Sequence, residues 1–111
     1  VYFFCSIHQN RIISNGTGIR VKTGGALSNA SQNYVTNNTA DGILIEATAG
    51  TIGTINDNDL SGNAGLDINN LAGATVNATC NWYGSNVPAT VATRVSGPVT
   101  YIPYLSNGTD V

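Results

Sequence analysis

The chain repeats one pattern of apolar and polar positions four times. An asparagine recurs at intervals of 23 to 25 residues, with an apolar or aromatic residue two positions after it. These asparagines are Asn10, Asn33, Asn58 and Asn81. Within each unit, apolar and polar residues alternate with a period of two, which predicts β-strands. Clusters of Gly, Asn and Ser separate the alternating stretches and predict turns between the strands.

Two further series of residues follow the same period. The second asparagine series is Asn15, Asn38 and Asn63, and it precedes a glycine series of Gly18, Gly42 and Gly65. The glycines open the short alternating stretches "GIRV", "GILI" and "GLDI". A unit of about 23 residues with three short strands predicts one coil of a parallel β-helix. Each strand would pair with its counterpart in the next coil, about 4.8 Å away.

The repeat also predicts which side chains face the core. Ile19, Ile43 and Leu66 should form one inward column, and Val21, Ile45 and Ile68 a second. We expect Leu27, Ile52 and Val76 inward on another strand, and Arg20, Leu44 and Asp67 outward. The four asparagines of the first series should form a ladder at a bend, bonding from coil to coil and to turn backbone groups.

Composition restricts the class of protein. Of the 111 residues, 41% are hydrophobic but only 9% are charged, against about 25% in an average soluble domain. A surface of Asn, Thr, Ser and Gly is typical of secreted β-rich proteins, so we expect an extracellular or cell-surface location. A net charge of −2 with four Lys and Arg residues argues against nucleic-acid partners. No apolar run approaches the roughly 20 residues of a membrane span.

The two cysteines should not form a disulfide. Cys5 belongs to the first coil and Cys80 to the fourth, which places them roughly 14 Å apart along the axis. A disulfide requires Cα atoms within about 7 Å. We therefore expect two free thiols that serve as small buried hydrophobic side chains. The opening "VYFFC" reads as a strand entered midway, so we expect further sequence ahead of residue 1.

The last third of the chain resembles a known closing element. The stretch "NATCNWYGSNVPATVATRVSGPVTYIPYL" is similar to the C-terminal end of right-handed β-helix regions in large secreted bacterial proteins. The matching elements are Asn81–Gly84 and Tyr101–Leu105, while the upstream coils resemble the β-helix repeat of the pectin-lyase-like superfamily. The resemblance implies a right-handed parallel β-helix of about four coils in residues 1–84, with a capping segment packed on it in residues 85–111.

Large side chains gather near the predicted end of the stack. Because a stack of coils ends in an open apolar face, we interpret these side chains as a cap. The predicted cap residues are Trp82, Tyr83, Tyr101, Pro103 and Tyr104. The alternative is that Trp82 and nearby tyrosines stack on a sugar ring, which an exposed indole would favour.

Candidate chemistry is sparse. Asp57 and Asp59 are the only close pair of carboxylates and the only candidates for a Ca²⁺ site, but we interpret them as solvated turn residues. The lyases of the superfamily imply an Arg or Lys base beside such a site, and that coil has neither. His8, the only histidine, is interpreted as a surface or bend residue. We therefore predict no catalytic residue, no metal and no cofactor.

The sequence favours a structural function over an enzymatic one. We expect a non-enzymatic module of an extracellular bacterial protein: a stalk, part of an adhesin, or the subunit of a self-assembling filament. The alternative is the end of a polysaccharide-binding or polysaccharide-degrading β-helix protein. Because the first coil has no visible cap, the expected partners are upstream coils of a longer chain or other copies, with a surface polysaccharide as a further candidate.

Overall fold

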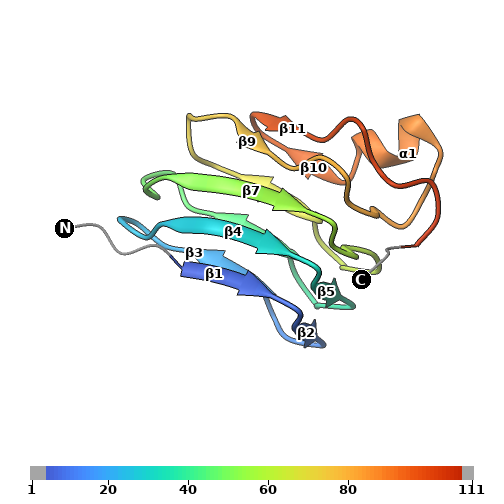
Figure 1. Cartoon of the computed structure of the whole chain (residues 1–111), viewed down its shortest axis with the longest axis horizontal. Coiled ribbons are helices and arrows are strands. Elements are labelled where there is room, and N and C mark those ends of the chain that lie inside the picture. Colours follow the sequence, from blue (N-terminus) through green and yellow to red (C-terminus); the bar gives the residue numbers. More distant parts are fainter. Residues whose placement is uncertain (1–4, 109–111) are drawn as a thin grey trace.

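The chain folds as a parallel β-solenoid of about four turns (Figure 1), as predicted. This computed structural model describes residues 5–108. The first two coils contain β1 (Cys5–His8), β2 (Arg11–Ile13), β3 (Ile19–Val21), β4 (Leu27–Ser31), β5 (Tyr34–Thr36) and β6 (Ile43–Ile45). The remaining elements are β7 (Ile52–Asn56), β8 (Ile68–Asn70), β9 (Val76–Asn77), α1 (Pro88–Ala92), β10 (Val95–Ser96) and β11 (Val99–Thr100).

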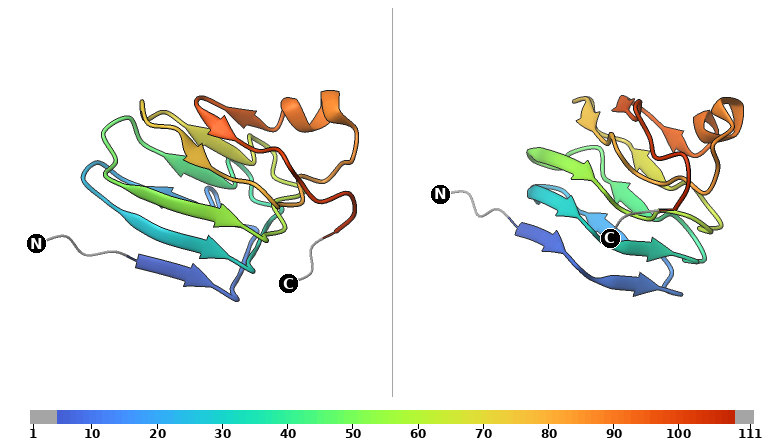
Figure 2. Two further views of the ribbon diagram at one scale, coloured as in Figure 1. Left: turned by 45° about the horizontal axis from the view of Figure 1, so that its top comes forward. Right: turned by 45° about the vertical axis from the view of Figure 1, so that its right-hand side comes forward.

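Each strand pairs in parallel with its counterpart one coil away. One face of the solenoid carries the order β1-β4-β7, and another carries β3-β6-β8-β10. The third face pairs β2 with β5 and continues through single bridges at Asp59 and Trp82. Figure 2 shows the coils stacked in sequence order along one axis. The stacking confirms that the 23- to 25-residue period is one coil.

The inward side chains of these faces form one core. Leu27 pairs with Ile52 on the first face, and Ile43 lies between Ile19 and Ile68 on the second. The buried apolar side chains are Ile19, Val21, Leu27, Ala30, Val35, Ile43, Ile45, Ile55, Leu60, Ile68, Val76, Ala78, Tyr83 and Val91. Because successive strand residues point to opposite sides, the alternation in the sequence translates directly into this core.

The predicted register of the third coil is wrong by two residues. Ile68, not Leu66, continues the column of Ile43, and Asn70 rather than Ile68 follows Ile45. The glycine column likewise continues through Asp67 and not Gly65, because the Ile43 N–H donates to the Asp67 carbonyl.

The error comes from the length of one turn. The turn from Asn63 to Ile68 has the same length as the turn from Asn38 to Ile43, whereas the sequence prediction aligned Gly65 with Gly42. As a consequence Asp67, which was expected to point outward, is 0% exposed.

The corners share one backbone conformation. In both asparagine series, the residue before each ladder asparagine has a φ between 56° and 76°. These residues are Gln9, Gln32, Asp57 and Cys80 in the first series, and Ser14, Asn37 and Gly62 in the second. A non-glycine residue in this left-handed region costs about 1–2 kcal/mol. Each turn therefore needs compensating interactions, and the asparagine that follows provides them.

The C-terminal segment both extends and covers the stack. After Gly84 the chain leaves the coil, forms α1 and returns as β10, which pairs with β8. Next, β11 pairs with β9, and the Leu105 N–H donates to the Asn81 carbonyl. The division into coils and cap at residue 84 remains a prediction; the structure adds that two strands after this point join the sheets.

Candidate functional site

The first asparagine series forms the predicted ladder along one corner. The backbone N–H of Asn10, Asn33 and Asn58 donates to Oδ1 of the asparagine in the next coil, at 3.0, 2.9 and 3.0 Å. The side-chain Nδ2 of the same three residues donates to the same Oδ1 at 3.2, 3.0 and 3.0 Å. Each of the first three coils thus donates to the asparagine oxygen of the coil that follows it, which gives the ladder a direction.

The ladder amides also bond backbone carbonyls of the preceding coil. Asn33 Nδ2 donates to the Ile7 carbonyl at 2.9 Å, and Asn58 Nδ2 donates to the Ala30 carbonyl at 2.9 Å. Asn81 Nδ2 donates to the Ile55 carbonyl at 2.8 Å. Asn33, Asn58 and Asn81 are 0% exposed, so these bonds pair polar groups that water does not reach.

The second asparagine series forms a parallel, shorter ladder. The Asn15 N–H donates to Asn38 Oδ1 at 3.0 Å, and the Asn38 N–H donates to Asn63 Oδ1 at 3.1 Å. Asn38 Nδ2 reaches the same Asn63 oxygen at 2.9 Å. The sequence reveals this series by its period but does not by itself assign it a hydrogen-bonding role. Both ladders run from the first coil towards the last.

Arg94 closes the second ladder. Its Nη2 donates to the carbonyls of Asn63 and Gly65 at 2.8 and 2.6 Å, and to Asp67 Oδ1 at 2.8 Å. Its Nε donates to Asp67 Oδ2 at 3.2 Å. Burial raises the pKa of the Asp67 carboxyl, and the hydrogen bonds and charge of Arg94 oppose that rise. Sequence reasoning missed this pair because it placed Asp67 on the outside.

Aromatic side chains lie at the end of the first ladder, and their role as a cap stays a prediction. Tyr83 is buried, and its hydroxyl donates to the Ala78 carbonyl at 2.7 Å. Burial raises the pKa of this phenol above its usual range. The Tyr101 ring meets Tyr83 edge-on, with centroids 6.4 Å apart and an interplanar angle of 80°. Tyr104 occupies the corner position that an asparagine one coil after Asn81 would occupy. The residues on either side of it show this, since the Cys80 N–H donates to the Pro103 carbonyl and the Leu105 N–H donates to the Asn81 carbonyl.

The first coil is open. In the described part of the chain, β1, β2 and β3 each have a strand partner on one side alone. Asn10 and Asn15 are exposed, and within residues 5–108 their Oδ1 atoms accept no hydrogen bond. A hollow of about 180 Å³ lies at this end, lined among others by Cys5, Ile7 and Ile19. The two ends of the solenoid are therefore chemically different.

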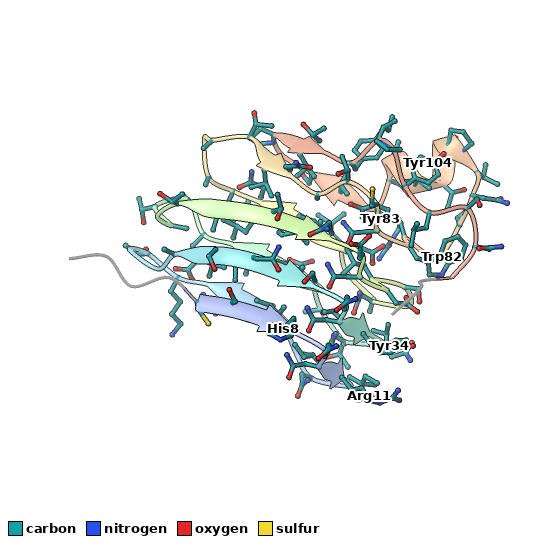
Figure 3. All side chains as sticks on the ribbon, viewed as in Figure 1. His8, Arg11, Tyr34, Trp82, Tyr83 and Tyr104 are labelled. Atoms are coloured by element: carbon teal, nitrogen blue, oxygen red, sulfur yellow. The ribbon has the colours of Figure 1, made fainter. Side chains whose placement is uncertain are left out.

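An outward column runs along the third face. Arg11 pairs with Tyr34, and bridges continue the column through Asp59 to Trp82. Figure 3 shows Arg11, Tyr34 and Trp82 in this order along one edge of the stack. The Arg11 Cζ atom lies 5.3 Å from the centre of the Tyr34 ring, and the Trp82 indole is partly exposed.

The two Ca²⁺ candidates lie in neighbouring positions of one corner, and each carboxylate has hydrogen-bond partners. Asn56 Nδ2 donates to Asp57 Oδ2 at 2.8 Å, while the Ser61 N–H and hydroxyl donate to Asp59 Oδ1 at 2.9 and 2.5 Å. Between residues 5 and 108, no three His, Cys, Asp or Glu side chains gather closely enough to hold a metal. His8 is exposed at the end of β1.

The cysteines are free, as predicted, but neither is buried. Cys80 is partly exposed at a corner, whereas Cys5 is exposed on the open edge. The prediction of a buried thiol at Cys5 fails because no described strand covers β1 on that side.

A second hollow follows a corner of the solenoid but offers little chemistry. It measures about 490 Å³ and is lined by small residues such as Ala49, Gly50, Ala72 and Gly73 from successive coils. Among the described residues, no charged or aromatic side chain lines it. The described residues also include no helix long and apolar enough to cross a membrane.

No protein-family model, curated protein or solved structure matches this chain. The resemblance to bacterial β-helix ends therefore rests on the residues quoted above.

Proposed function

We propose that this chain is a non-enzymatic structural module of an extracellular bacterial protein, in which it forms part of a β-solenoid stalk, adhesin or filament. The observation that carries the proposal is the contrast between the ends. The last coil is covered by Tyr83, Tyr104 and Arg94, whereas within residues 5–108 the first coil presents three unpaired strand edges and two open asparagine acceptors.

An open edge of this kind favours stacking. The unpaired N–H and C=O groups of an edge strand are a template for another strand. In repeat proteins each unit contacts only its neighbours, so stability grows with every interface that is added. A further coil on β1, β2 and β3 would bury the same apolar columns that already hold the other coils together.

The carboxylates of the chain support a structural rather than a catalytic role. Asp67 is paired with Arg94 at 2.8 Å, and Glu46 is paired with Arg20 at 2.6 Å. Asp41 Oδ1 accepts the Leu66 N–H at 2.8 Å, and its Oδ2 accepts Asn69 Nδ2 at 3.1 Å. Each of these groups holds one coil to another.

The proposed location rests on composition and on the resemblance of the tail. The surface depends on Asn, Thr, Ser and Gly, and 9% of the residues are charged. Residues 77–105 resemble the closing coil of secreted bacterial β-helices, which supports a bacterial cell-surface or secreted protein.

Coil addition tests the structural proposal. A variant with a second copy of residues 25–49 directly ahead of the first coil should remain monomeric and melt at least about 5 °C higher, since each kcal/mol shifts the Tm of such a domain by about 4–8 °C. The control carries serine at Val35, Ile43 and Ile45 of the added copy. Differential scanning calorimetry and light scattering give the two readouts. An unchanged Tm, with added amides that exchange like an unfolded chain, contradicts the proposal.

The polysaccharide alternative has one observation in its favour. Tyr34 and Trp82 are partly exposed on the same outward column, two coil steps or roughly 10 Å apart, with the Asp59 carboxylate between them. Aromatic faces beside a polar group are suited to sugar rings.

Glycan binding by this column is tested directly. If the alternative holds, binding to a soluble-polysaccharide panel should fall at least about tenfold in Trp82→Ala, as expected when an anchoring aromatic is lost. Thr100→Ala, an exposed position on β11, serves as the control. Equal signals from both variants, or no polysaccharide bound by the unmodified chain, would remove the alternative.

A further inference from the structure

The geometry points to one kind of partner for the open first coil: an acidic parallel coil with asparagine at both corners, belonging to a polypeptide segment other than a second copy of this chain. The inference rests on the proposed function, in which the chain acts by stacking. Three features carry it: the direction of the ladders, the chemistry of the chain's own ends, and the charge of the first coil.

The direction of the ladders defines what the first coil lacks. Each ladder asparagine except the last of its series donates to the Oδ1 of the asparagine one coil later, as Asn10 does to Asn33 at 3.0 Å and Asn15 does to Asn38 at 3.0 Å. The Oδ1 atoms of Asn10 and Asn15 are therefore open to donors from a preceding coil. An asparagine at the same corner, with its backbone N–H and its Nδ2, supplies two donors to each oxygen.

A second copy of this chain does not provide these donors. At the C-terminal end, the corner position one coil after Asn81 is occupied by Tyr104. At the second corner, the position one coil after Asn63 is occupied by the Arg94 guanidinium, which already donates hydrogen bonds to Asn63, Gly65 and Asp67. Two first coils placed face to face would oppose acceptor to acceptor. Neither arrangement of copies continues the ladders.

The charge of the first coil selects an acidic partner. Arg11, Arg20 and Lys22 are exposed, and the sequence holds no Asp or Glu before Asp41. On its other side, the first coil already contacts a carboxylate of the second coil. Glu46 accepts Arg20 Nε at 2.8 Å and the Thr23 N–H at 2.9 Å. A partner with a carboxylate near Arg11 or Arg20 would repeat this arrangement.

A synthetic peptide of residues 25–49 is the probe for such a partner. It carries the corner asparagines Asn33 and Asn38, two carboxylates, and no Lys or Arg. Its inward positions match those of the first coil, because the two coils already pair in register. Fluorescence anisotropy of the labelled peptide with the full chain measures its binding.

The inference predicts saturable binding that depends on asparagine and on salt. A peptide with Asn33→Ala and Asn38→Ala should bind at least about tenfold more weakly, as expected for the loss of two or more hydrogen bonds. Raising the salt from about 0.05 to 0.5 M should also weaken binding, because exposed charges are screened. In the full chain, Asn10→Ala should weaken binding, whereas Asn86→Ala, an exposed asparagine far from this edge, should not.

The possible results separate this inference from the proposed function. Absence of binding, or binding that is indifferent to both asparagine changes, overturns the inference, while a stabilised coil-addition variant would still uphold the structural role. Ordered oligomers of the chain alone that Asn10→Ala abolishes would also overturn it, because copies would then satisfy the ladder. An unchanged Tm of the coil-addition variant overturns the proposed function itself.

Discussion

At neutral pH, Arg94→Ala is expected to lower the free energy of unfolding by about 3–5 kcal/mol, the cost of removing one partner from a buried ion pair. Asp67 is 0% exposed, and its carboxylate receives both Nη2 and Nε of Arg94. The substitution would also leave the Asn63 and Gly65 carbonyls without this donor. Chemical denaturation followed by circular dichroism measures the loss.

The loss should become smaller in acid. Burial already raises the pKa of Asp67, and removing the opposing Arg94 raises it further. A carboxyl whose folded pKa is raised favours folding below its unfolded pKa, and this contribution disappears as the pH rises through the folded value. A protonated Asp67 in the variant no longer needs a cation. The difference between variant and parent should therefore be largest near pH 7 and should shrink towards about pH 3.5.

Arg20→Ala is the matched control. Its side chain is 53% exposed and contacts Glu46 at 2.6 Å on the surface, where such pairs contribute about 0–1 kcal/mol. We expect a change within that range. Equal losses for the two arginines, or an Arg94 effect that grows in acid, would contradict the assignment of Asp67 as a buried, paired carboxylate.

Asn58→Ala is the second substitution with a large expected effect, about 3 kcal/mol or more, since each buried polar group left unpaired costs about 1–3 kcal/mol. Asn58 Oδ1 accepts the N–H and Nδ2 of Asn33, and its own Nδ2 donates to the Ala30 and Asn56 carbonyls and to Asn81 Oδ1. Alanine removes all of these bonds in the middle of the stack.

Asn10→Ala provides the comparison for Asn58→Ala. Asn10 occupies the exposed end of the same ladder, where water can replace its lost partners. Its expected cost is below about 1 kcal/mol. Thermal denaturation of both variants gives the test. If Asn10 and Asn58 prove equally important, burial is not what makes the ladder stabilising, and the hydrogen-bond argument is wrong.

The sequence predicts the solenoid well because its strongest signals are local and periodic. The ladder asparagines repeat every 23 to 25 residues, and each one follows a residue in the left-handed conformation. That coupling fixes the corners, and the corners fix the strands between them. The alternation on each strand then determines which side chains are buried.

The remaining features depend on contacts that no short pattern contains. The alternation in the sequence predicts that Asp67 points outward from a strand. Its burial depends on the hydrogen bonds from Arg94, which lies 27 positions later in the chain. The two-residue error in the predicted position of Leu66 comes from the turn between Asn63 and Ile68. Cys5 looks like a core residue by type, yet it lies on an edge that no described strand covers.

Between Gly84 and Arg94, one corner of the solenoid accommodates a longer connection than the other corners do. The backbone leaves the coil, makes a helical turn with Val91 buried, and rejoins the sheet at β10 beside β8. Gly84, with a φ of 81°, marks its exit, and the Arg94–Asp67 contact marks its return. The segment between them is consequently a natural insertion point, where new loops or even a folded domain could be accommodated while the rungs on either side keep their alignment.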